Sequence, residues 1–163
     1  MSNTPTFMIL GTQKAGTTWI ANMLKQHPQI FIPEDKEIHF FNKTYNYKKG
    51  YDWYHSFFEN SNEAQITGEA TPNYLWTDTS QAENVESFRT QNIPKKVYEY
   101  NPDLKFIVSL RDPVSRAFSA YKTLIRGGHI SPNSHITEVL DKRGIITMGY
   151  YVQHISNWLQ YFP

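Results

Sequence analysis

The sequence predicts an α/β domain in which a central parallel sheet is flanked by helices. Two apolar runs have the character of buried strands, residues 7–10, which end at Gly11, and residues 105–110. Strands covered on both faces carry continuous apolar runs rather than alternating ones. Each run leads into a segment with helical spacing, and this alternation of strand and helix is typical of a parallel sheet with crossover helices.

Composition limits the number of domains and the kinds of partner. With 163 residues, 39% of them hydrophobic, the chain can bury one sizeable core, and we expect a single domain over residues 1–163. A net charge of +1 gives no field that favours nucleic acid or an anionic membrane. The chain has no cysteine, and its N-terminus has neither a basic signal nor an apolar run long enough to span a membrane. We therefore expect a cytoplasmic protein.

The loop after the first predicted strand has the composition of an anion site. Gly11 and Gly16 permit positive φ angles, and Thr17 and Thr18 can cap the helix that follows. The helix N-terminus supplies aligned donors, and Lys14 adds a full positive charge. A nucleoside triphosphate P-loop would read G-x-x-x-x-G-K-[ST], whereas this lysine lies two positions before the second glycine. The loop alone leaves a kinase or NTPase open but weakened.

The stretch Lys14-Ala-Gly-Thr-Thr-Trp19 resembles the 5′-phosphosulfate loop of sulfotransferases that use 3′-phosphoadenosine 5′-phosphosulfate (PAPS). In that family a lysine is followed by a small residue, Gly-Thr-Thr or Gly-Thr-Ser, and often Trp. The resemblance implies a P-loop NTPase-like three-layer fold. It also implies that six consecutive residues bind the cofactor: Lys14, Ala15, Gly16, Thr17, Thr18 and Trp19.

The next segments continue the α/β pattern. Residues 17–26 have apolar side chains at helical spacing and end before His27-Pro28, and residues 30–32 predict a short strand that Pro33 stops. Residues 51–58 have a weak helical pattern. Four side chains of this region either approach an acceptor or pack in the core, and packing is favoured: Tyr47, Tyr51, Trp53 and His55.

Residues 36–42 place two acid–base groups together. In an extended segment, Glu37 and His39 would share one face and Ile38 and Phe40 the other. A solvated strand face with an ordinary salt bridge would give the same pattern. The segment resembles the Lys/Asn-Glu-x-His-Phe-Phe motif of carbohydrate sulfotransferases, which implies that Glu37 is the base for the acceptor hydroxyl. His39 is the rival base, because other sulfotransferase branches use histidine.

Residues 65–74 predict a strand that leads into a loop at the carboxyl edge of the sheet, where open α/β folds bind ligands. The segment resembles the family motif Gly-Glu-x-Thr-Pro-x-Tyr. This implies that Glu69 and Tyr74 join Glu37 and His39 in binding the acceptor. Several heparan-type members have a lysine where this chain has Ala70, which removes one cation from the expected cleft.

A second anion site is predicted where residues 105–110 run into a helix. Asp112 and Pro113 are good helix-start residues, and Ser115 and Ser119 would share one face of the helix. Arg111, at the strand end, either binds a phosphate or forms a capping network with its neighbouring aspartate. An apolar stripe is expected to face the core: Val114, Ala117, Phe118 and Tyr121.

The same stretch resembles the family's 3′-phosphate site, Arg-Asp-Pro-x-x-Arg-x-x-Ser-x-Tyr, at every fixed position. The resemblance implies that Arg111 and Ser119 hold the 3′-phosphate and that Arg116 is a structural partner.

Further helices are predicted over residues 76–90, 93–100, 134–142 and 149–162. Family members usually continue after this point with another strand, so the sheet is expected to be incomplete at the C-terminal side. On that expectation, self-association or a partner would supply the missing strand.

The expected function is transfer of a sulfuryl group from PAPS to a small-molecule or saccharide hydroxyl. Lys14, Glu37 and His39 are the expected catalytic residues. The histidine spacing gives no zinc motif such as H-E-x-x-H, and no metal is expected. Two alternatives stay open: a P-loop-type nucleotide kinase or NTPase, and a non-catalytic, truncated nucleotide-binding remnant.

Overall fold

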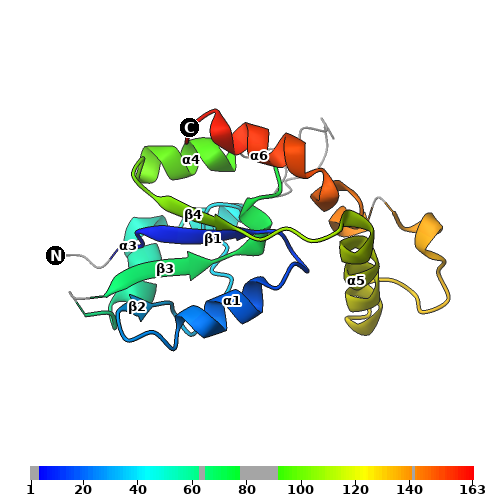
Figure 1. Cartoon of the computed structure of the whole chain (residues 1–163), viewed down its shortest axis with the longest axis horizontal. Coiled ribbons are helices and arrows are strands. Elements are labelled where there is room, and N and C mark those ends of the chain that lie inside the picture. The colour runs from blue at the N-terminus through cyan, green and yellow to red at the C-terminus, as the bar shows by residue number, and fades with distance from the viewer. Residues whose placement is uncertain (1–3, 63–64, 78–91, 141) are drawn as a thin grey trace.

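The computed structural model describes residues 4–62, 65–77, 92–140 and 142–163. Within these ranges, four parallel strands form one sheet in the order β2-β3-β1-β4 (Figure 1). The strands are β1 (Phe7–Gly11), β2 (Ile30–Phe31), β3 (Ile66–Ala70) and β4 (Lys105–Val108). The parallel sheet and its flanking helices confirm the predicted fold class.

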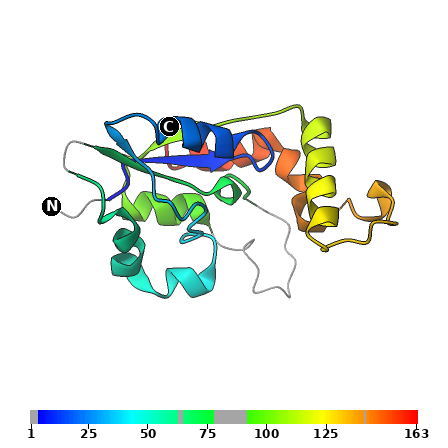
Figure 2. The same cartoon turned by 90° about the horizontal axis from the view of Figure 1, so that it is seen from below.

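The helices cover both faces of this sheet and one end of it. Figures 1 and 2 show α1 on one face, α3 and α4 on the other, and α5 beyond the carboxyl ends of the strands. The α-helices are α1 (Thr17–Leu24), α2 (Thr44–Tyr47), α3 (Gly50–His55), α4 (Ile93–Tyr100), α5 (Pro113–Arg126) and α6 (Tyr151–Leu159). Short 3₁₀ turns are η1 (Ser56–Phe58), η2 (Pro72–Tyr74), η3 (Ile136–Glu138), η4 (Lys142–Gly144) and η5 (Thr147–Gly149).

Strand β1 lies inside the sheet, between β3 and β4, and is buried along its whole length. Its alternating side chains face two different clusters. Met8 and Leu10 pack with side chains of α3, α4 and α6, whereas Phe7 and Ile9 pack with Ala21 of α1. A strand covered on both faces is what its unbroken apolar run predicts.

The prediction that residues 105–110 are buried is wrong. β4 lies at the edge of the described sheet, Phe106 and Ile107 are only half-buried, and Val108 is 38% exposed. Leu110, just beyond the strand, is 48% exposed. The apolar run shows that this segment is a strand, but it does not show where the strand lies in the sheet.

Helix positions follow the predictions more closely than helix faces do. On α1, Trp19 is 66% exposed and Met23 is also exposed, because the helix packs through Ala21, Ile20 and Leu24. Where a helix was predicted over 134–142, the described residues form the short turn η3, and Lys142 begins η4. The helix expected over 76–90 lies almost wholly outside the described residues.

Helix α5 and the chain after it form a separate small cluster. Ala117 packs with Ile130, Val139 and Ile145 away from the main core. The expected core stripe of α5 is therefore split: Ala117 is buried, whereas Val114 and Phe118 are exposed. These two side chains face the hollow described below.

Gly11 fits tightly where β1 ends. Its φ is 144°, and a Cβ there would lie 2.5 Å from the main-chain oxygen of Pro72. Gly50, at the start of α3, also has positive φ, at 82°, but a Cβ there would meet nothing within 4 Å. An alanine at Gly50 would bring only backbone strain, whereas an alanine at Gly11 would bring backbone strain and a steric clash.

We expect Gly11→Ala to destabilise the fold by on the order of 3 kcal/mol, since strain and overpacking add at this position. Gly50→Ala, which brings only the backbone strain, should cost about 1 kcal/mol. Urea denaturation of both variants measures the difference. Equal losses would mean that the Pro72 contact relaxes without cost.

Candidate active site

The segment that carries Glu37 and His39 is not extended, as the alternation predicted. Both residues have left-handed backbone conformations, with φ of 64° for Glu37 and 56° for His39. The two residues between and after them, Ile38 and Phe40, are buried. The prediction that the two acid–base groups share a face is confirmed, but the twisted backbone rather than a strand pleat produces it.

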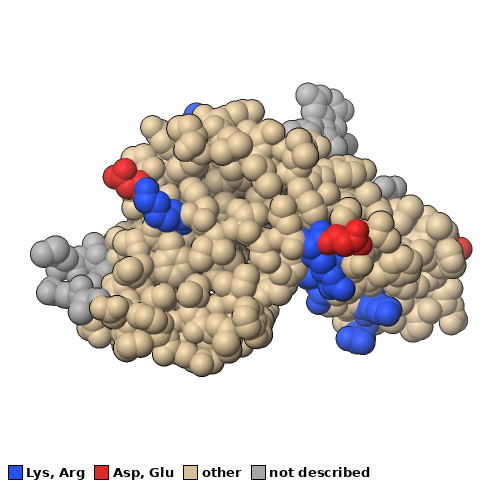
Figure 3. Space-filling view, in the orientation of Figure 1, with Lys and Arg blue, Asp and Glu red and all other residues tan. Residues whose placement is uncertain are grey.

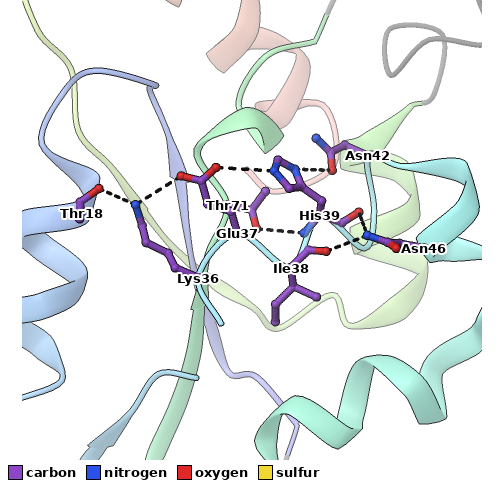
Figure 4. Close-up of polar contacts among 8 residues, drawn as sticks. All are labelled: Thr18, Lys36, Glu37, Ile38, His39, Asn42, Asn46 and Thr71. Carbon is purple, nitrogen blue, oxygen red and sulfur yellow. Dashed lines mark hydrogen bonds and ion pairs between the residues drawn. The ribbon is translucent and has the colours of Figure 1, made fainter. Parts of the chain in front are cut away.

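A continuous chain of polar contacts joins this segment to the start of α1 (Figure 4). Lys36 Nζ donates to Thr18 Oγ1 at 2.5 Å and to Glu37 Oε1 at 3.3 Å. His39 Nε2 lies 3.5 Å from Glu37 Oε2, and His39 Nδ1 lies 3.2 Å from Asn42 Oδ1. Lys36 and Asn42 were not among the predicted site residues, although both lie within the motif around Glu37.

These neighbours keep Glu37 in its charged form. The hydrogen bond with His39 is the largest effect and lowers the pKa of the Glu37 carboxyl; partial burial opposes it, and the positive charge of Lys36 lowers it further. The net pKa is below the usual value for glutamate. A half-exposed carboxylate that is ionised near neutral pH can accept a proton from a hydroxyl group.

Main-chain hydrogen bonds hold the left-handed segment against β3. Glu37 N donates to Ala70 O at 3.2 Å, and His39 N donates to Thr71 Oγ1 at 3.4 Å. From the other side, the buried Asn46 donates through Nδ2 to Ile38 O at 3.0 Å. Strained φ angles persist where surrounding contacts over-determine them, as these do.

The loop between β1 and α1 has the expected positive φ angles. Gly11 and Gly16 have φ of 144° and 86°, as predicted, and Lys14 has φ 71°, which was not predicted. The expected cap by Thr17 or Thr18 is wrong, because Gly16 is the N-cap and no side chain caps α1. Thr17 is buried and Thr18 is engaged by Lys36. The first N–H groups of α1 are thereby left without a side-chain acceptor among the described residues.

This loop is tied to the segment that follows β4. Ser109 Oγ donates to Ala15 O at 2.7 Å, and Arg111 Nη1 donates to Lys14 O at 3.3 Å. Thr12 N also donates to Ser109 O at 2.7 Å. The two segments with predicted anion-binding residues are therefore directly connected.

A hollow of about 420 Å³ opens between this loop and α5. It brings together Lys14, Arg111 and Ser119, three of the predicted cofactor residues. Figure 3 shows Lys and Arg side chains gathered where α5 meets the rest of the molecule. The remaining lining residues are Val114, Ser115, Phe118, Lys122, Thr123 and Arg126.

The N-terminus of α5 is formed as predicted. Asp112 accepts a hydrogen bond from Ser115 N at 2.8 Å, which lowers the pKa of the aspartate, and Pro113 occupies the first turn. Arg116 is fully buried, and its Nη2 donates to Gly144 O at 3.2 Å and to Ile145 O. This confirms the prediction that Arg116 is structural, since it points into the protein and away from the hollow.

Glu69 and Tyr74, which were predicted to bind the acceptor, lie in the core. Their exposed fractions are 1% and 0%. Burial raises the pKa of Glu69 to about 7, although the hydroxyls of Tyr74, Tyr54 and Thr71 oppose the rise. Neither carboxylate oxygen of Glu69 makes a hydrogen bond of standard geometry within the described structure. In this structure the two side chains are buried in the core, and their contact with an acceptor stays a prediction.

Of the four aromatic residues expected to pack in the core, Tyr47 and Trp53 are partly buried against it, whereas Tyr51 is 39% exposed. The ring of Tyr51 stacks on His55, and His55 Nε2 lies 2.9 Å from Tyr100 OH. Phe40 packs edge-on against Phe41 beneath them.

The described residues contain no group of three His, Asp or Glu side chains that could hold a metal ion. Likewise, none of the helices in the described parts is long and apolar enough to cross a membrane.

The fold and the hollow define a class of protein: an α/β domain with a hollow lined by Lys and Arg side chains at the carboxyl edge of a parallel sheet. Residues 4–163 match the sulfotransferase domain family, and the chain belongs to that family.

Individual relatives agree with this assignment. The chain is 31% identical to heparan sulfate glucosamine 3-O-sulfotransferase 5 of Homo sapiens, over 98% of this chain and 45% of the relative. It is 32% identical to heparan sulfate glucosamine 3-O-sulfotransferase 3B1 of Homo sapiens, over 98% of this chain and 39% of the relative. A sulfotransferase structure from Alicyclobacillus acidocaldarius aligns with a TM-score of 0.78 at 27% identity, over 98% of this chain and 69% of that chain. The chain thus spans less than half the length of these heparan sulfate relatives.

Burial of Glu69 predicts a pH-dependent stability. Because its pKa is raised from 4.5 to about 7, the folded state holds this proton more tightly than the unfolded state, and stability falls as pH rises through that range. At 1.36 kcal/mol per pH unit, the linkage amounts to about 3 kcal/mol. Glu69→Gln should remove it, so that the variant gains stability over the wild type between pH 5 and pH 8.

Urea denaturation at several pH values measures this effect, with the exposed Glu59→Gln as the matched control. A difference between Glu69→Gln and wild type that does not change with pH would show that Glu69 is ionised throughout.

Proposed function

We propose that this chain transfers a sulfuryl group from PAPS to a hydroxyl acceptor. One observation supports this most strongly: the loop that lines the cationic hollow leads directly into the start of α1, which polar contacts join to Glu37. Lys14 of that loop lines the hollow, and Thr18 at its end bonds Lys36, which in turn bonds Glu37. An anionic donor and a base for the acceptor would therefore meet at one place.

The residues present suit a nucleotide with two phosphate positions. Lys14, the N–H groups at the start of α1, which no described side chain caps, and the open space above Gly16 suit the 5′-phosphosulfate. Arg111 and Ser119 in the same hollow suit the 3′-phosphate. When bound, PAPS supplies an activated sulfuryl group on its 5′-phosphate.

On the acceptor side, Glu37 is the proposed base. His39 lies between Glu37 and Asn42, so its ring is held in place to orient the carboxylate rather than to face solvent. Lys36 and His39 keep Glu37 ionised until it accepts the proton of the hydroxyl. Lys14 and the loop N–H groups stabilise negative charge that develops on the oxygen of the departing nucleotide.

A saccharide hydroxyl is the proposed acceptor class, because relatives that match 98% of the chain are named for action on heparan sulfate. Ala70 is buried and supplies no charge beside Glu37, which leaves uncharged saccharides within the proposed range. Completion of the sheet beside β4, by a partner or a second copy, stays a prediction.

Glu37→Gln should lower sulfuryl transfer by about 100-fold or more, since it removes the base but keeps the shape of the side chain. His39→Ala should lower it by about 10-fold, as expected for loss of an orienting partner. Transfer from labelled PAPS is measured against heparan sulfate oligosaccharides and uncharged saccharides, with the exposed Glu34→Gln as a control that keeps wild-type activity.

Calorimetry on the same proteins tests the donor. The wild type and Glu37→Gln should bind adenosine 3′,5′-bisphosphate equally and more tightly than ATP with magnesium. Preference for ATP would indicate a kinase or NTPase. Binding of the bisphosphate without transfer to any acceptor would indicate a non-catalytic nucleotide-binding protein, and inactivity of His39→Ala alone would make His39 the base.

Lys36→Met should move the acid limb of the pH–rate profile to higher pH. The reason is that the charge of Lys36 lowers the pKa of Glu37, so its loss lets the carboxyl hold its proton to a higher pH. Lys25→Met is the control, because Lys25 forms its ion pair with Glu34, at an Nζ–Oε2 distance of 3.1 Å, and not with Glu37. An unchanged acid limb would show that Lys36 does not set the protonation of the base.

A further inference from the structure

Two cationic side chains that belong to none of the sequence motifs line the hollow. Lys122 and Arg126 share it with Lys14, Arg111 and Ser119. Both are exposed, and neither forms an ion pair with a carboxylate in the described parts of the chain. Their place in the hollow needs an explanation beyond ordinary surface charge.

The geometry of α5 places these cations beside Ser119. Lys122 follows Ser119 by three residues and Arg126 follows Lys122 by four, so the three side chains lie on one face of this helix. Ser115, one turn before Ser119, lines the same hollow. A phosphate at Ser119 would thus have Arg111 toward the start of the helix and Lys122 on the next turn.

The charge balance of the hollow favours a highly charged anion. Four of its lining residues are cations, Lys14, Arg111, Lys122 and Arg126, and none of its lining residues is an acid. Asp112, the neighbouring acid, is held by Ser115 N at the helix start. Cations in a partly enclosed hollow reinforce one another in attracting an anion.

We propose that Lys122 and Arg126 complete the 3′-phosphate subsite and select nucleotides that carry a 3′-phosphate. This inference rests on the proposed function, which assigns the 3′-phosphate to Arg111 and Ser119. Lys122 binds the phosphate directly beside Ser119. Arg126, one turn farther along α5, adds a second positive charge to the same hollow. A nucleotide with only 5′-phosphates leaves both cations without a partner.

The test compares two nucleotides that differ only in the 3′-phosphate. Calorimetry measures binding of adenosine 3′,5′-bisphosphate and of adenosine 5′-monophosphate to the wild type and to the Lys122→Met/Arg126→Met double variant. We expect bisphosphate affinity to fall by on the order of 10-fold or more, as for loss of charge-assisted hydrogen bonds, with monophosphate affinity unchanged. Lys105→Met, an exposed lysine at the opposite end of the sheet, is the matched control and keeps wild-type affinity for both.

The outcomes separate this inference from the proposed function. Unchanged bisphosphate affinity in the double variant would overturn the inference alone. Equal weakening for both nucleotides would also overturn it, because the cations would then act only as a general field. A wild type that binds neither nucleotide would overturn the proposed function and this inference with it. Thermal unfolding of the double variant confirms that the exposed substitutions leave the fold intact.

Discussion

The parallel pairing of β1 with β3 and β4 is the constraint on which the site depends. Because all three strands run the same way, their carboxyl ends meet at one edge, and each end delivers a different part of the chemistry. β1 leads to Lys14, and β4 leads to Arg111. β3 contributes Ala70, whose main-chain oxygen holds Glu37 in place. One sheet edge thereby collects Lys14, Arg111 and Glu37, to which the proposed function assigns anion binding and the base, from distant parts of the sequence.

Much of this arrangement could be predicted from the sequence because the relevant signals are local. A continuous apolar run marks β1, and the Asp112-Pro113 pair marks the start of α5. The relation between Lys14 and Arg111 also follows, since both come after parallel strands that pair in the sheet. Positions along a single helix can also be predicted from spacing: Ser115 and Ser119, four residues apart, line the same hollow.

The rest depends on packing that no local pattern reveals. Alternation along residues 36–42 indicates a strand, but hydrogen bonds from Asn46 and to Thr71 impose left-handed conformations on Glu37 and His39 instead. The burial of Glu69 is likewise set by side chains far away in the sequence. Burial of a strand also depends on its neighbours, so the edge position of β4 could not be read from its own residues.

The hydrogen bonds from Ser109 and Arg111 to the carbonyl groups of Ala15 and Lys14 have a consequence for ligand affinity. They link the two segments proposed to bind anions, so neither segment can reorder alone. The conformational entropy of assembling the proposed nucleotide site is then lost during folding rather than during binding. A ligand that engages one of the two proposed phosphate positions finds the other already ordered, so binding at the second position carries no further ordering cost.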